Sequence, residues 1–348
     1  MKVGATASAL TIAALALSGC TASPAVDLGP ATEIRLGYFA NVTHAPALVG
    51  VEHGFFEAAL GDTTLSTHVF SAGPAAIEAL SAGAIDIAYI GPSPAINSYI
   101  KSAGESAVIV AGATIGGAAL VVRDGIETAS DLDGTTLATP QLGNTQDVAL
   151  RSWLAAEGYQ TSTMGGGDVT IQPTENADTF ALFQAGQIDG AWLAEPWVSR
   201  LVIDGGAHVL VDEADLWADG AFATTVVLVN KTFLIEHPET VAAVLEGHLA
   251  AVTWLNENPD DAAGVINAAL EAETGKALAD AVIERALENV TFSVDPLAST
   301  FSTLVEHAVA ATTGVDGDIA GLFDLSLING LLETSGADPV SAAGLGTE

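Results

Sequence analysis

Short apolar runs alternate with segments of helical periodicity along the chain from Glu33 onward. Each run has the length of a buried strand, and the segment that follows repeats its apolar positions every three to four residues, as a helix does. The expected strands cover residues 34–39, 65–70, 85–90, 107–111, 120–123, 135–139, 168–172, 188–193, 207–212 and 223–229. This alternation predicts an α/β fold with largely parallel sheets.

Amphipathic helices are expected after the last of these strands. They cover residues 238–256, 259–273, 278–289 and 297–312, and a weaker helical pattern starts at Ala320. Earlier in the chain, Pro46, Pro74 and Pro94 each follow an expected strand closely. Because proline suits the first turn of a helix, each of them marks a helix start. The sequence therefore predicts three helix N-termini at one sheet edge.

A short sequence motif, the repeated phrase, occurs twice in the chain. Residues 82–90 and 185–193 share Ala-Gly-x-Ile-Asp-x-Ala followed by an aromatic and an apolar residue. Each copy has a glycine suited to end a helix, an apolar strand, and then a proline-bearing loop at 91–94 or 194–197. Chance similarity in an alanine-rich chain is the alternative. Ligands bind beyond the carboxyl ends of such strands, so the repeat predicts two lobes facing one ligand.

The expected organisation follows from length and from this repeat. A chain of 348 residues exceeds the roughly 100–200 residues usual for one domain. One lobe is expected to comprise residues 33–124 and 220–333, and the other residues 125–219, with a hinge at Asp124-Gly125 and a polar tail at 334–348.

The N-terminus resembles that of bacterial lipoproteins. A short apolar stretch leads to Leu17-Ser18-Gly19-Cys20, which is similar to a lipobox. The stretch is too short to span a bilayer and suits a signal peptide. Residues 1–19 are therefore expected to be cleaved, Cys20 to be lipidated, and residues 20–32 to form a tether; a plain secretory signal is the alternative. The expected localisation is the outer face of the cell membrane.

Charge limits the partners. The formal net charge is −34, with 9 basic residues against 43 acidic ones, which argues against nucleic-acid binding. The negative sign does not exclude a small anionic ligand. Salt screens the exposed charges, so local dipoles at the site determine whether an anion binds. Cys20 is the only cysteine, and the histidines show no metal-ligand spacing, so no disulfide within the chain, no metal and no cofactor are expected.

Six strings follow the lipobox in order: HAPAL (44–48), GFF (54–56), AGP (72–74), GPSPA (91–95), PQLGNT (140–145) and EPW (195–197). Together they resemble solute-binding proteins of ABC importers, in the aliphatic sulfonate, nitrate and taurine branch. The resemblance implies a two-lobed, periplasmic-binding-protein-like fold of type II, with two Rossmann-like lobes, a hinge and C-terminal helices. It also implies a monomer that carries a small anion or zwitterion to a permease and ATPase complex, and no enzymatic activity.

The candidate ligand-binding residues lie in strand-end loops and at helix starts. They are Asn41, His44, Gly73, Gly91, Ser93, Gln141, Gly143, Asn144, Thr145, Glu195 and Trp197. A helix N-terminus carries about half a positive charge and free N–H groups, so donors there suit sulfonate, nitrate or carboxylate oxygens. Structural roles are the alternatives: an N-cap for Ser93, tight turns for Gly73 and Gly143, core packing for His44.

Glu195 separates the ligand hypotheses. It would repel a bare anion, yet it suits the ammonium group of an amino-sulfonate such as taurine. A salt bridge to Arg200 or Arg151 is the alternative. Nitrate, bicarbonate or a heterocyclic vitamin precursor are the other ligands considered, and a receptor-linked sensor or an enzyme are the other classes of protein.

Overall fold

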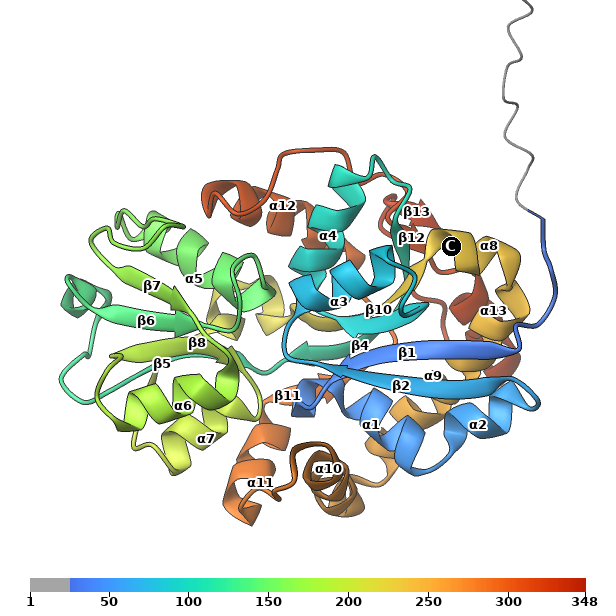
Figure 1. Ribbon diagram of the computed structural model, residues 1–348, viewed down its shortest axis with the longest axis horizontal. Helices are drawn as coiled ribbons and strands as arrows, with labels where there is room; N and C mark the ends of the chain where they lie inside the picture. Colours follow the sequence, from blue (N-terminus) through green and yellow to red (C-terminus); the bar gives the residue numbers. More distant parts are fainter. Residues whose placement is uncertain (1–25) are drawn as a thin grey trace, which may run out of the picture.

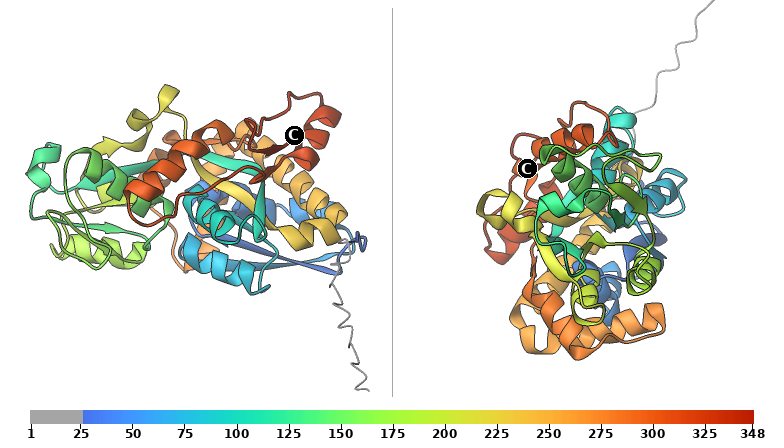
Figure 2. Two further views of the ribbon diagram at one scale, coloured as in Figure 1. Left: turned by 90° about the horizontal axis from the view of Figure 1, so that it is seen from above. Right: turned by 90° about the vertical axis from the view of Figure 1, so that its left-hand side faces the viewer.

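The computed structural model describes residues 26–348. Two sheets lie side by side along the long axis, each flanked by helices (Figures 1 and 2). Cys20, the signal peptide and the first part of the tether lie outside the described residues. The mixed α/β architecture with two lobes expected from the sequence is confirmed.

The first sheet has the strand order β13-β12-β4-β10-β3-β1-β2, and β11 also pairs with β4. Parallel pairing joins β1 to β2 and to β3, whereas β10 runs antiparallel between β3 and β4. The four residues of β3 are all buried, as expected for a central strand covered on both faces. The strands are β1 (Glu33–Phe39), β2 (Thr64–Phe70), β3 (Ile87–Ile90), β4 (Ala107–Gly116), β10 (Ala223–Asn230), β11 (Val290–Phe292), β12 (Phe323–Asp324) and β13 (Gly346–Thr347).

Helices α1 to α4, α8 to α10 and α13 accompany this sheet and form the first lobe with it. Pro46 and Pro74 lie in the first turns of α1 and α3 as expected, and α4 begins at Pro92, two residues before the expected Pro94. The helices are α1 (Ala45–Glu52), α2 (Phe55–Leu60), α3 (Gly73–Ser81), α4 (Pro92–Lys101), α8 (Lys231–Glu236), α9 (Pro238–Glu257), α10 (Pro259–Thr274) and α13 (Ser326–Ser335).

The second sheet has the order β7-β6-β8-β5-β9 and forms the second lobe with α5 to α7. Residues of β5 alternate between two cores: Ala119 and Val121 pack with Phe183, and Leu120 and Val122 pack with Trp192. The elements are β5 (Ala118–Val122), β6 (Thr136–Thr139), α5 (Thr145–Ala156), β7 (Thr170–Pro173), α6 (Asn176–Gln184), β8 (Gly190–Ala194), α7 (Trp197–Ile203) and β9 (His208–Asp212). The 3-10 turns in both lobes are η1 (Val42–His44), η2 (Ala129–Leu132), η3 (Glu213–Leu216), η4 (Ala218–Gly220) and η5 (Ala298–Thr300).

The repeated phrase has the same structural role in both lobes. Gly83 and Gly186 follow α3 and α6 with positive φ, 68° and 70°. The aspartate of each copy then accepts a backbone N–H of a neighbouring strand, Asp86 from Arg35 and Asp189 from Thr136. Both aspartates also pair with an arginine, Arg35 at 2.5 Å and Arg123 at 3.2 Å. The two copies are therefore equivalent helix-to-strand corners.

The crossing between the lobes differs from the expectation. β5 pairs with β8 and β9 in the second sheet, so the first crossing lies at Gly116-Gly117, and the expected hinge at Asp124-Gly125 is wrong. Both glycines have φ of +76°, which lets the chain leave one sheet and enter the next without a strand break elsewhere. The amide of Gly116 donates to Phe222 O on the return crossing at 3.0 Å. The two chain crossings between the lobes are therefore hydrogen-bonded to each other.

Two C-terminal helices lie between the lobes. α11 (Asp280–Glu288) packs against α7, and α12 (Phe301–Ala310) packs against both α4 and α5, across the top of Figure 1. Phe301 and Leu304 belong to the core of the first lobe, whereas Ala308 and Ala311 form a small buried cluster with Val148 of α5. α12 thus contacts both lobes through different faces.

Both ends of the described chain bind the first lobe. Leu28 N donates to Glu236 O, and Ala31 N donates to Thr240 Oγ1, so part of the expected tether follows α8 and α9. The expected polar tail also differs, because its residues 346–347 form β13 beside β12. The polar side chains of this segment suggested no regular structure, but its backbone pairs with β12. Within the described residues, no helix has the length and apolar character needed to cross a membrane.

A buried carboxyl group lies where the chain returns to the first lobe. Glu213, in η3, is 2 % exposed and accepts a hydrogen bond from Trp192 Nε1 at 2.8 Å. Burial raises the pKa of Glu213 from its ordinary 4.5 to about 7, because the charged form loses its hydration, and the Trp192 bond opposes this only in part.

Glu213→Gln is expected to stabilise the protein at pH 8 by about 3 kcal/mol and to leave its stability unchanged near pH 4. Between pH 4.5 and about 7, the folded wild type keeps a proton that the unfolded chain has released, so its stability falls as the pH rises through this window. Chemical denaturation across this range measures the difference, with the exposed Glu57→Gln as the control. Parallel pH profiles for wild type and Glu213→Gln would contradict the assignment.

Candidate functional site

A small polar cavity lies between the lobes at the carboxyl ends of strands from both sheets. Its volume is about 20 Å³, room for roughly one water molecule, so the lobes are closed on each other. The first lobe contributes loops after β1, β2 and β3 and the start of β10, and the second contributes loops after β6, β7 and β8. The wall consists of Phe39, Asn41, Thr43, His44, Ser71, Gly91, Pro140, Asn144, Gln146, Asn176, Ala194 and Thr224.

Helix N-termini of the two lobes meet beside this cavity. The amide of Gly73, at the start of α3, donates to Asn144 Oδ1 at 3.1 Å. The amide of Ser93, in the first turn of α4, donates to Thr145 Oγ1 at 3.4 Å. Asn144 and Thr145 stand at the start of α5 in the other lobe. The expected convergence of helix starts is therefore present, and two of its donors bind oxygen atoms across the cleft.

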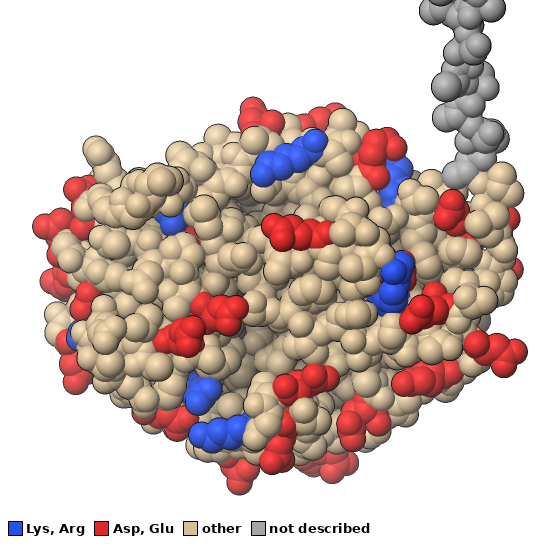
Figure 3. Space-filling view, viewed as in Figure 1, with Lys and Arg blue, Asp and Glu red and all other residues tan. Residues whose placement is uncertain are grey.

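Among the residues that the structure describes, those that line the cavity wall include no acidic or cationic side chain. Two carboxylates that adjoin wall residues in sequence, Asp147 and Glu195, are each engaged by an arginine, whereas Glu175, next to Asn176, is exposed to solvent. Asp147 is fully buried and accepts bonds from Arg151 Nε, Thr139 Oγ1 and Gly143 N. The acidic side chains that give the chain its charge of −34 are numerous on the outer surface (Figure 3). The wall is therefore neutral and polar, with helix dipoles as its source of positive potential.

His44 is a neutral donor on this wall. It is 2 % exposed, and burial lowers the pKa of its imidazole to about 3. Its Nδ1 accepts the amide of Phe39 at 3.2 Å, which places the proton on Nε2. No described residue accepts a hydrogen bond from Nε2. His44 thus combines a structural bond with a free donor.

Glu195 turns away from the cavity, although Ala194 lines it. Its carboxylate accepts from the amide and the hydroxyl of Ser199, each at 2.9 Å, and from Arg285 Nη1 at 3.2 Å. Burial raises the pKa of Glu195, and the Ser199 and Arg285 contacts oppose that rise. The ion pair considered as the alternative to ligand contact is present, but its partner is Arg285, because Arg200 pairs with Asp204 and Arg151 with Asp147. In this state the carboxylate does not face the helix N-termini.

The candidates fall into three groups. Asn41, His44, Gly91 and Asn144 line the cavity; Gly73, Ser93 and Thr145 lie directly beside these residues at the contact between the lobes. Gly143 and Trp197 line two outer pockets, and Gln141 has a buried Oε1 that no described residue contacts. The polar wall residues that the sequence analysis missed are Thr43, Ser71, Gln146, Asn176 and Thr224. Ser71 and Asn176 closely follow β2 and β7, so the strand-end rule applied to every strand would have found them.

Two larger pockets open on either side of the cavity. One, of about 480 Å³, lies beside Trp197 and Lys276; the other, of about 420 Å³, lies beside Gly143 and Lys101. Trp197 Nε1 donates to Asn41 Oδ1 at 3.0 Å, a third hydrogen bond between the lobes. The cleft is thus a narrow polar centre between two wider mouths.

Two α/β lobes joined by crossing strands and closed over a polar cavity define a two-lobed solute-binding protein. Solved structures share this fold. The alkanesulfonate-binding protein SsuA of Xanthomonas axonopodis pv. citri, bound to MOPS, gives a TM-score of 0.69 at 24% identity, covering 82% of this chain and 96% of that one. The nitrate-binding protein NrtA of Synechocystis gives 0.67 at 17% identity, covering 80% and 81%.

The chain belongs to the NMT1-like family, whose model matches residues 27–271. A Bacillus subtilis protein named as a putative aliphatic sulfonates-binding protein is 26% identical over 290 residues, which are 81% of this chain and 80% of that protein. The taurine-binding periplasmic protein of Escherichia coli is 30% identical over 200 residues, 57% of this chain and 59% of that protein. The solute-binding class expected from the sequence is confirmed.

Gly91→Ala is expected to hinder closure. A Cβ at Gly91 would collide with Oγ1 of Thr145 in the other lobe and lie 3.2 Å from Thr145 Cβ, while the φ of −70° at Gly91 suits any residue. Overpacking of this kind costs about 1–3 kcal/mol. Because the clash exists only when the lobes are closed, it destabilises the closed state and not the open one. Small-angle scattering should show a larger radius of gyration than wild type. Thr145→Ala in the same chain removes the hydroxyl and should restore compaction in part; no change in radius for Gly91→Ala would refute the close approach.

Proposed function

We propose that this protein is the extracytoplasmic solute-binding lipoprotein of an ABC importer. It binds a small sulfonate between its lobes and delivers it to a permease and ATPase complex as a monomer. The observation that carries this proposal is the meeting of helix N-termini at a neutral polar cavity. The relatives named for aliphatic sulfonates and taurine support the ligand class. Function consists of binding and release, without the making or breaking of bonds.

The closed cleft suggests how oxygen atoms are bound. In the structure, the Gly73 and Ser93 amides donate to side-chain oxygens of Asn144 and Thr145. A sulfonate offers acceptor oxygens that share one negative charge, so it competes for these amides when the lobes part. Ser93 adds a hydroxyl group that is buried and bonded to no described residue, and His44 adds Nε2. These donors form the proposed sulfonate cradle.

The same wall favours alkanesulfonates over taurine. Among the described residues, no carboxylate lines the cavity to receive an ammonium group, because Glu195 is engaged by Ser199 and Arg285. Asn176 Oδ1, buried and without a partner among the described residues, is a neutral acceptor on the wall. A neutral acceptor contributes less to an ammonium than a carboxylate does. Nitrate, bicarbonate and heterocyclic precursors are the alternatives that the binding experiment distinguishes.

Ethanesulfonate is expected to bind the mature domain more tightly than taurine, nitrate, bicarbonate or a pyrimidine. Ser93→Ala should weaken ethanesulfonate by about 1.5–3 kcal/mol, because a hydroxyl donor to a charged oxygen is lost. Titration calorimetry measures both, and Ser66→Ala, at a distant half-buried serine of β2, is the control. If nitrate bound most tightly, nitrate and not a sulfonate would be the ligand of this site. If Ser93→Ala left the affinity for ethanesulfonate unchanged, Ser93 would not be part of the cradle.

Membrane attachment rests on Cys20, which lies outside the described residues. Several acyl chains, each CH₂ worth about 0.8 kcal/mol, would anchor the folded domain stably. Cys20→Ala is expected to abolish labelling by a radioactive fatty acid and to release the protein from membranes or leave it unprocessed. A wild-type chain that never takes up the label would disprove the lipid anchor without affecting the binding proposal.

A further inference from the structure

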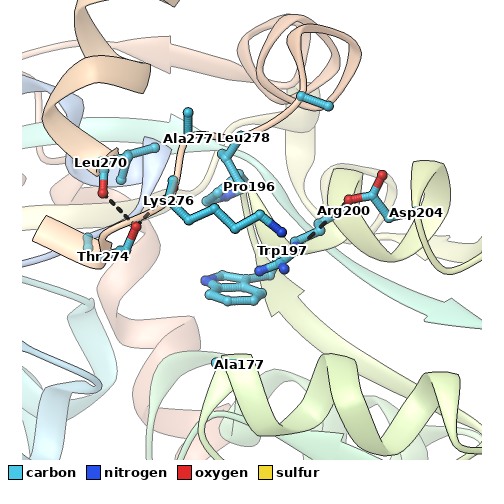
Figure 4. A pocket seen from close by; sticks show the side chains of 12 residues that line it. Ala177, Pro196, Trp197, Arg200, Asp204, Leu270, Thr274, Lys276, Ala277 and Leu278 are labelled. Atoms are coloured by element: carbon cyan, nitrogen blue, oxygen red, sulfur yellow. Dashed lines mark hydrogen bonds and ion pairs between the residues drawn. The ribbon is translucent and has the colours of Figure 1, made fainter. Parts of the chain in front are cut away.

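The larger outer pocket combines an apolar lining with two cations. It lies between α7 of the second lobe and the segment that joins α10 to α11, and its volume is about 480 Å³. Trp197, Leu270 and Leu278 supply apolar surface, Arg200 and Lys276 supply positive charge, and the carboxylate of Asp204 also lines the pocket beside Arg200. In Figure 4, the Lys276 side chain extends over Trp197 toward Arg200. An apolar pocket with convergent charged groups is typical of an organic ligand site.

The cations here are unusual for so acidic a chain. Ion pairs with carboxylates engage all five arginines and Lys231. Lys276 forms no ion pair with any described residue and points into a pocket. Arg200 is held by aromatic rings, with its Cζ 4.3 Å from the Phe180 ring centre and 5.0 Å from that of Trp197, and its pairing with Asp204 is long at 3.9 Å. Both cations therefore remain able to bind an anionic group.

The pocket adjoins the cavity. Ala40 and Ala177 line the pocket, while their neighbours Asn41 and Asn176 line the cavity. The hydrogen bond from Trp197 Nε1 to Asn41 Oδ1 lies between the two spaces. When this bond opens, a molecule whose sulfonate occupies the cavity can extend into the pocket. The cavity alone, at about 20 Å³, has no room for a tail.

We infer that the pocket is a second compartment of the ligand site, which takes the tail of an aromatic sulfonate that carries another acidic group. The ring lies against Trp197 and Leu278, and the distal carboxylate or sulfonate lies between Arg200 and Lys276. This inference rests on the proposed function and narrows its substrate class. The pocket volume of about 480 Å³ has ample room for a ring with one substituent, whereas a two-carbon sulfonate would leave it unused.

The test compares ethanesulfonate, benzenesulfonate and 4-sulfobenzoate by titration calorimetry on the mature domain. Affinity is expected to rise at least ten-fold from the first ligand to the third. Lys276→Ala should weaken 4-sulfobenzoate about three- to five-fold, the range for an exposed charge pair, and leave ethanesulfonate unchanged. Lys101→Ala is the matched control, because Lys101 is also unpaired among the described residues and lines the opposite mouth.

Leu278→Ser provides a second variant, on the half-buried apolar side of the pocket. It should weaken both aromatic ligands several-fold without changing ethanesulfonate, because it removes apolar contact at a site remote from the sulfonate cradle. Equal affinity of the three ligands, or equal effects of Lys276→Ala and Lys101→Ala, would overturn the second compartment while sulfonate binding stands. Binding of no sulfonate at all would overturn the proposed function, and the inference with it.

Discussion

The contact between helix N-termini across the cleft is the constraint on which the rest of the structure depends. The amides of Gly73 and Ser93 must find acceptors when the lobes close, since a buried N–H without a partner is costly. Asn144 and Thr145 supply these acceptors from the facing helix. Strand order, the proline-marked helix starts and the absence of a side chain at Gly91 all serve to bring these helix ends within bonding distance. A site for an anion follows from the same geometry.

The protein manages its large negative charge by separating it from the cleft. Asp147 and Glu195, which adjoin wall residues in sequence, are each paired with an arginine and turned into hydrogen-bonded shells, and Glu175 is exposed to solvent. Neutral donors then face the cavity, and His44 stays neutral because of its burial. Since helix dipoles act over a short range and salt screens the outer surface, a chain of charge −34 retains a site suited to anions.

Local patterns in the sequence predicted strands β1 to β10 and most helix starts, because buried runs and prolines act within a few residues, but they did not predict the short strands β11, β12 and β13. The crossing was misplaced because Asp124-Gly125 and Gly116-Gly117 are both plausible turns, and only strand pairing distinguishes them. Glu195 was correctly placed at a strand end, yet its direction depends on Ser199 one turn further and on Arg285, far along the chain. Such long-range contacts leave no periodic trace in a single sequence.

The small size of the apolar contact through α12 has a consequence for energetics. Each lobe has its own core, whereas the cluster of Val148, Ala308 and Ala311 joins them with three modest side chains. Parting the lobes at this point exposes little hydrocarbon to water, so this contact adds little hydrophobic stabilisation to the closed state. The balance is then set by a few polar contacts that a ligand can replace. A small free-energy difference between the open and closed states makes ligand capture reversible, and it also allows a partner to open the lobes and release the ligand.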